Sequence, residues 1–142
     1  MLEDSSDLFV VAVSAVIFKE NKILMMKRSL NKKAGPGIWE MLSGRVQHGE
    51  ELLEALHREI EEESNLIVEI EKRPIDLYTT TRLGKPMLLV VYIAKYISGE
   101  VQLSQEHCDY HFGSLDEFKE RCTLKRLIQS VEKAFKQKDF FL

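Results

Sequence analysis

Two long apolar segments set the strongest constraint on what this chain can fold into. Residues 10–18 and 87–96 are rich in β-branched and other apolar side chains, as is typical of strands buried within a sheet. A shorter run of the same kind, residues 22–27, follows the first one after the sequence KEN, and this spacing predicts a β-hairpin. We therefore expect a sheet built around these three segments.

The remaining segments predict what lies around that sheet. Glycine and proline make residues 34–37 a loop, a short strand is expected over 39–42, and a strand pattern runs over 66–81. The sequence SLDEF, from residue 114, has the spacing of a helix capping box. Apolar residues at helical spacing predict a last helix: Leu124, Leu127, Ile128, Val131 and Phe135. The expected fold is α/β (α+β), with helices packed on a mixed sheet.

Composition and charge narrow the class of protein. The 142 residues are 44% apolar and 30% charged, which suits one compact domain over residues 1–142. The formal net charge of −3 disfavours tight binding to long nucleic acid, which needs many cationic contacts. The apolar run near the start is far shorter than the roughly 20 residues of a membrane span, and acids precede it in place of a basic leader. We expect a cytoplasmic protein with no membrane partner.

The most informative stretch is a glutamate-rich helix over residues 51–64. Its apolar residues recur at intervals of three and four and form one stripe that should pack on the sheet: Leu52, Leu53, Leu56 and Ile60. At about 100° per residue, Glu59 and Glu63 fall on the side of this stripe, and Glu62 lies one step round from them. Three carboxylates are thus expected to cluster beside a buried face.

Such a cluster needs a compensating cation, because neighbouring carboxylates repel each other and burial raises the cost. Arg58 can reach Glu62 at a spacing of four, but one guanidinium cannot neutralise three acids. A divalent metal can, and carboxylate oxygens favour Mg²⁺ or Mn²⁺ over Zn²⁺. The alternative is that the glutamates form an ordinary solvated helix face.

The stretch from residue 44 to residue 66 resembles the signature of the Nudix hydrolases. The glycine, charged and aliphatic positions of that pattern hold Gly44, Glu50, Arg58, Glu59, Ile60, Glu62, Glu63, Asn65 and Leu66. Asn65 replaces the second glycine, and asparagine tolerates the left-handed conformation expected there. The resemblance implies an α/β/α sandwich and a Mg²⁺- or Mn²⁺-dependent enzyme that hydrolyses a nucleoside diphosphate linked to a further group, X.

The resemblance also implies roles for individual residues. Glu59, Glu62 and Glu63 are expected to be metal ligands, with Glu50 an occasional ligand or a residue just behind them. Arg58 is expected to orient the carboxylates. Gly44 is expected to be a turn that folds the loop back over the helix.

The residue that deprotonates the attacking water has two candidates. One is Glu62, and the other is Glu106, which we expect on the loop after the last strand. In that same stretch His107, Cys108 and His111 could be zinc ligands, but a place in the core or on the surface is the better interpretation.

Substrate recognition is less constrained by the sequence. Lys27 and Arg28 are candidates to meet terminal phosphates, and Trp39 is a candidate to stack on a base, although core packing explains a tryptophan equally well. Phe9, Tyr78 and Tyr110 are further stacking candidates.

The expected substrate follows from the absence of residues that mark two other substrate subgroups of the family. Pro74, Tyr78 and Pro86 miss the positions that mark the family's ADP-ribose and dinucleoside polyphosphate subgroups. We therefore expect a nucleoside triphosphate, hydrolysed to monophosphate and pyrophosphate. An ADP-ribose or nucleoside diphosphate sugar pyrophosphatase, and a nucleotide-sensing module without turnover, are the alternatives. A homodimer is possible.

Overall fold

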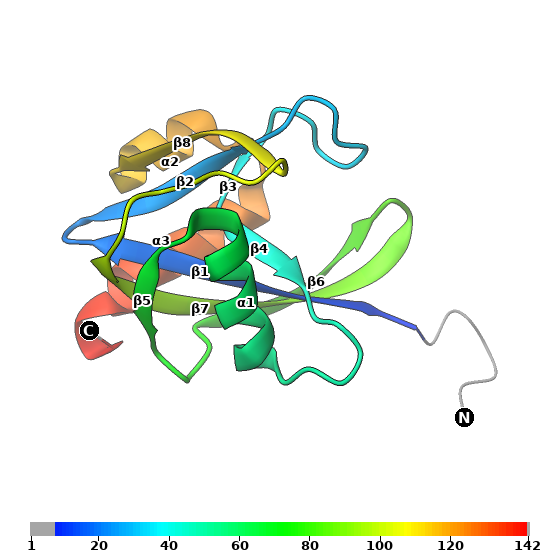
Figure 1. Ribbon diagram of the computed structural model, residues 1–142, viewed down its shortest axis with the longest axis horizontal. Coiled ribbons are helices and arrows are strands. Elements are labelled where there is room, and N and C mark those ends of the chain that lie inside the picture. The colour runs from blue at the N-terminus through cyan, green and yellow to red at the C-terminus, as the bar shows by residue number, and fades with distance from the viewer. Residues whose placement is uncertain (1–7, 142) are drawn as a thin grey trace.

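The computed structural model describes residues 8–141, which form one mixed sheet with helices on both of its faces (Figure 1). The strands of this part of the chain are β1 (Val10–Lys19), β2 (Lys22–Arg28), β3 (Trp39–Glu40), β4 (Leu42–Arg45), β5 (Ile67–Ile70), β6 (Asp76–Arg82), β7 (Lys85–Ser98) and β8 (His107–Gly113). Its helices are α1 (Leu52–Ser64), α2 (Leu115–Arg121) and α3 (Lys125–Phe141). None of these helices has the length and apolar character that crossing a membrane would require.

Strands β1 and β7, the two long apolar segments, pair in parallel at the centre of the sheet. Around them the order is β3-β2-β1-β7-β5, and β4, β6 and β8 pair with β1, β7 and β2 respectively. The predicted hairpin of residues 10–18 and 22–27 is confirmed, since β1 and β2 run antiparallel with Phe18 opposite Ile23. The central position of β1 and β7 explains why they are apolar almost throughout.

Two separate cores lie on the two faces of the sheet. Alternate side chains of a strand point to opposite faces, so Val13 and Ile17 of β1 pack in the core under α1. Val16 and Phe18 pack on the other face, in the core that α2 and α3 cover. The expected α/β/α sandwich is therefore confirmed, with α1 on one side of the sheet and α3 on the other (Figure 1).

The sheet differs from the sequence expectation in three places. The short strand expected over residues 39–42 is split, because β3 ends at Glu40 and pairs with β2, whereas β4 begins at Leu42 and pairs with β1. The strand pattern over residues 66–81 is two strands, β5 and β6, which both pair with β7. Glu106 lies on a turn after β7, as expected, but β7 is not the last strand, because β8 begins at the next residue and pairs with β2. Strand β8 is buried only at its two ends, and it lacks the apolar run that marked the buried strands.

Helix α1 is capped at both ends. Glu51 and Glu54 form a reciprocal capping box at its start, and Asn65 closes its end in the left-handed conformation, with φ of 60°. The capping box expected at residue 114 is also present, formed by Ser114 and Glu117. These boundaries fix where the glutamates of α1 stand relative to the sheet.

Candidate functional site

The glutamates of α1 are distributed between the core and a cavity as the helical spacing predicts. Glu59 and Glu63 are 8% and 7% exposed, on the side of the helix that faces the sheet. The side chain of Glu62, one step round the helix, is 55% exposed. All three line one cavity of about 940 Å³ that opens between α1, the loop after β2 and the β6–β7 hairpin.

Arg58 holds three of the nearby carboxylates at once. It donates from Nη1 to Glu59 Oε1 at 2.7 Å and to Glu62 Oε2 at 3.2 Å. It also grips both oxygens of Glu50, at 2.8 and 2.9 Å, and this hydrogen bonding lowers the pKa of Glu50 to about 2. The remaining bond, 3.0 Å to the carbonyl of Arg45, ties the guanidinium to strand β4. Glu50 itself does not line the cavity.

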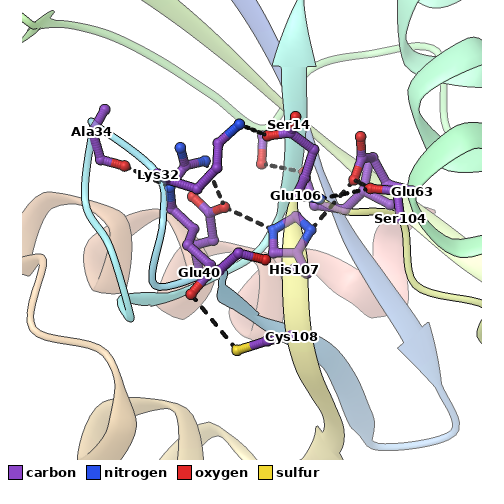
Figure 2. A network of polar contacts seen from close by, with 12 residues as sticks. Ser14, Lys32, Ala34, Glu40, Glu63, Ser104, Glu106, His107 and Cys108 are labelled. Atoms are coloured by element: carbon purple, nitrogen blue, oxygen red, sulfur yellow. Dashed lines mark hydrogen bonds and ion pairs between the residues drawn. The ribbon is translucent and has the colours of Figure 1, made fainter.

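Glu63 is held from the other side, by residues around the start of β8 (Figure 2). Ser104 Oγ donates to Glu63 Oε2 at 2.6 Å, and His107 Nδ1 lies 3.4 Å from the same oxygen, an ion-pair distance. His107 Nε2 lies 2.9 Å from Glu40 Oε2, and Glu40 in turn meets Arg28 at 3.4 Å. A buried line of alternating charge therefore joins α1 to β2.

This arrangement gives the two buried glutamates opposite acidities. For Glu59, burial raises the pKa, helped by Glu63 and Glu62 and opposed by Arg58. Burial also acts to raise the pKa of Glu63, but His107 and Ser104 outweigh it and the pKa is lowered. Burial disfavours the charged form of His107, yet its contacts with Glu40 and Glu63 raise its pKa to about 9.

Gly44 is required for close packing and not for a turn. The prediction of a turn here was wrong, because Gly44 lies in strand β4, opposite Val13 of β1. A Cβ at this position would lie 2.0 Å from Cδ of Glu59. Strand β4 can approach α1 this closely only without a side chain, and Glu59 occupies the space that is left.

The carboxylates suit a hard divalent cation in chemistry, although they face protein partners here. Among residues 8–141, no three Asp, Glu, His or Cys side chains converge as a ready metal site. Glu59, Glu62 and Glu63 nevertheless offer oxygen donors along one wall of the cavity, and Glu59 and Glu63 are buried. The negative charges of Glu62 and Glu63 lie close enough to Glu59 to raise its pKa. A cation of charge +2 would relieve that repulsion, so the donor set fits Mg²⁺ or Mn²⁺.

The other predicted site residues separate into two groups. Arg28 and Glu106 line the cavity, and Glu106 pairs with Lys32 at 2.5 Å on its rim. Lys27 and Trp39, which face each other across β2 and β3, do not line it. Trp39 packs against the core, with the guanidinium of Arg121 4.7 Å from its ring.

Sequence reasoning suggested one further residue of the cavity, Tyr78, but missed several of its arginines. Tyr78 was one of four stacking candidates and is the one that lines it; burial raises its pKa to about 12, and Arg126 lies 4.2 Å from its ring. Arg45, Arg82 and Arg126 also line it, and none of them had a local sequence signal. The pairing of β4 with β1, the pairing of β6 with β7 and the packing of α3 bring them there.

Comparison with known proteins decides the family. The sequence model of the NUDIX domain matches residues 8–137. The chain belongs to the NUDIX family. Solved structures agree on the fold: an Ap4A hydrolase from C. elegans superposes with a TM-score of 0.83 at 24% identity, covering 93% of this chain and 99% of that one. The MutT protein of Methanosarcina mazei gives 0.77 at 25% identity, covering 98% and 99%.

Curated NUDIX relatives differ in the substrates that their names give. The ADP-ribose pyrophosphatase of Methanocaldococcus jannaschii is 32% identical over 108 residues, 75% of this chain and 62% of that protein. The 8-oxo-dGDP phosphatase NUDT18 of Mus musculus is 26% identical over 96 residues, 68% of this chain and 28% of that protein. The match thus spans less than two thirds of the length of either relative.

Proposed function

We propose that this chain hydrolyses the pyrophosphate bond of a nucleoside triphosphate, releasing the monophosphate and pyrophosphate, with Mg²⁺ or Mn²⁺ as cofactor. One observation supports this best: the three glutamates of the NUDIX signature share a cavity with a group of arginines. A pyrophosphate bond under attack needs both kinds of partner, since negative charge builds up on its oxygens.

In this proposal Glu59, Glu62 and Glu63 hold the metal. The metal, when bound, neutralises charge on the phosphate oxygens and favours ionisation of the attacking water. Arg58 orients Glu59 and Glu62 through its two bonds from Nη1, and anchors itself on Glu50 and the Arg45 carbonyl. Ser104, just before β8, and His107, at its start, orient Glu63. Each ligand thus has a fixed partner behind it.

The proton of the attacking water has two possible acceptors in this chain. Glu62 is the most exposed of the three carboxylates that we assign to the metal. Glu106 lines the same cavity from the turn before β8 but is engaged by Lys32. Both acids are in ion pairs, but Glu62 meets Arg58 at 3.2 Å whereas Glu106 meets Lys32 at 2.5 Å. We assign the base to Glu62, because it is the more loosely held of the two.

The second candidate function is hydrolysis of ADP-ribose or a nucleoside diphosphate sugar. The observation that favours it is the 32% identity to the M. jannaschii ADP-ribose pyrophosphatase. The single domain, the cytoplasmic location and the possible homodimer inferred from the sequence stay predictions.

The test is a product assay on a panel of nucleotides with Mg²⁺, Mn²⁺ or a chelator present. We expect monophosphate and pyrophosphate from triphosphates, and no turnover with the chelator. AMP and ribose phosphate from ADP-ribose, with triphosphates untouched, would select the second candidate.

Variants of α1 test the residue assignments. We expect Glu62→Gln and Glu63→Gln to lower kcat by about two orders of magnitude while the fold is retained, because each removes a metal ligand. Glu61→Gln is the matched control, since Glu61 is an exposed glutamate of the same helix that does not line the cavity. Normal turnover by Glu63→Gln would contradict the assignment.

A further inference from the structure

A strongly basic hollow of about 400 Å³ adjoins the cavity at the end away from α1. Half of its ten lining residues are basic and only one, Glu106, is acidic. The whole chain carries 20 basic and 23 acidic residues, so this concentration of positive charge is local. The basic rim is formed by Arg28, Lys32, Lys33, Arg45 and Arg82, and all five also line the larger cavity.

One nitrogen of the Arg28 guanidinium is buried without a hydrogen-bond acceptor among the described residues. The Nε of Arg28 donates to the carbonyl of Ala34 at 2.8 Å, and its Nη1 meets Glu40 at 3.4 Å. Its Nη2 is buried and finds no hydrogen-bond partner within the described part of the chain. A buried guanidinium nitrogen without an acceptor is costly, and a bound anion would supply one.

Arg45 and Arg82 are free to meet an anion as well. Within residues 8–141 neither side chain forms an ion pair, whereas Lys32 is paired with Glu106. The pKa of Arg82 is lowered, first by burial and then by the like charges of Arg45 and Arg28. These arginines therefore repel one another, and negative charge placed between them would remove that cost.

The hairpin of β6 and β7 positions Arg82 on the basic rim. Strands β6 and β7 form a hairpin that projects beyond the sheet, across from the loop that follows β2 (Figure 1). Leu83 and Gly84, both with positive φ, make the tight turn at its tip. Arg82 and Lys85 are opposite each other at this turn, yet only Arg82 lines the cavity.

We propose that the basic rim binds the third phosphate of a nucleoside triphosphate while the glutamates of α1 act on the bond between the other two. This inference rests on the proposed function and adds to it the residues that bind the third phosphate. Bidentate guanidinium groups are well suited to phosphate oxygens. A diphosphate joined to a neutral sugar has no third phosphate, and would leave the rim unused.

The first experiment measures binding without catalysis. Inorganic tripolyphosphate and pyrophosphate are titrated calorimetrically into the wild-type chain, Arg82→Gln and Lys85→Gln, at constant ionic strength with chelator present. We expect the wild type to prefer tripolyphosphate. Arg82→Gln should weaken tripolyphosphate binding about tenfold, as expected for one charged hydrogen-bonding partner.

Lys85→Gln is the matched control, because it removes the same charge from the same hairpin outside the cavity. Its affinity for tripolyphosphate should stay close to that of the wild type. Equal losses in the two variants would show only a long-range charge effect and overturn the proposal. The same conclusion would follow if the wild type bound tripolyphosphate no better than pyrophosphate. Unchanged circular dichroism of both variants confirms that they are folded.

A kinetic comparison then separates this inference from the proposed function. Arg82→Gln should raise KM for a nucleoside triphosphate about tenfold and leave KM for ADP-ribose within twofold. An equal rise for both substrates would overturn the rim assignment while leaving hydrolysis intact. A wild type without turnover on any nucleotide would defeat the proposed function, and the tripolyphosphate titration would still decide whether the rim binds a third phosphate.

Discussion

At the scale of single residues, the site depends on which side chains stand behind the carboxylates. Glu59 and Glu63 are four residues apart on one helix face, but Arg58 supports the first and His107 with Ser104 the second. The pKa values of the two glutamates consequently shift in opposite directions. The signature spacing predicts the carboxylates and Arg58, whereas Ser104 and His107 reach Glu63 only through the tertiary fold.

Gly44 provides a residue-scale prediction. Gly44→Ala should push the Glu59 carboxylate away from Arg58, because the three atoms nearest to the new Cβ all belong to Glu59. We expect a loss of about 1 to 2 kcal/mol in the free energy of unfolding. In a Glu59→Ala background the same substitution should cost clearly less, since the obstructing side chain is absent. Chemical denaturation of the four proteins measures this, and equal costs in both backgrounds would contradict the packing role.

At the scale of elements, β6 is tied to α3 through one buried carboxylate. Asp76 accepts bonds from Arg126 at 2.8 and 3.1 Å, from Ser130 at 2.7 Å and from Lys133 at 3.0 Å. Burial acts to raise the pKa of Asp76, but these bonds outweigh it and hold the pKa below its ordinary value of 3.8. The tie matters to the cavity, because Tyr78 of β6 and Arg126 of α3 both line it.

The pH dependence of this tie follows from the sign of the shift. A carboxylate with a depressed pKa in the folded state stabilises the fold above its ordinary pKa, and that contribution fades as the pH falls below about 4. Asp76→Asn should therefore lower the unfolding free energy by about 2 kcal/mol at neutral pH and by progressively less on acidification. Asp109→Asn is the control. Asp109 accepts a hydrogen bond from the N–H of the next residue, as Asp76 does, but it is exposed. A gap between wild type and Asp76→Asn that stays constant down to pH 3 would contradict this prediction.

At the scale of the whole molecule, local patterns predicted the elements and long-range pairing assembled the site. The central strands and helix α1 were predictable because apolar periodicity and capping are properties of neighbouring residues. Arg82 and His107 were not, since the pairing of β6 with β7 and of β8 with β2 carries them to the cavity. Lys27 and Arg28 show the same limit: successive strand residues point to opposite faces, and only Arg28 lines the cavity.

A metal ion bound by the carboxylates of α1 should therefore stabilise the entire fold. Metal that binds only the folded chain adds about 1.4 kcal/mol of stability for each tenfold rise in free metal above Kd. For a chain of 142 residues this corresponds to about 2–5 °C in Tm. We expect Tm to rise in this way with Mn²⁺ for the wild type and for Glu61→Gln. The rise should be much smaller for Glu59→Gln, which loses a buried carboxylate of the cluster. Identical rises in all three proteins would place the metal elsewhere, because only Glu59 combines burial with a place on the cavity wall among the residues changed.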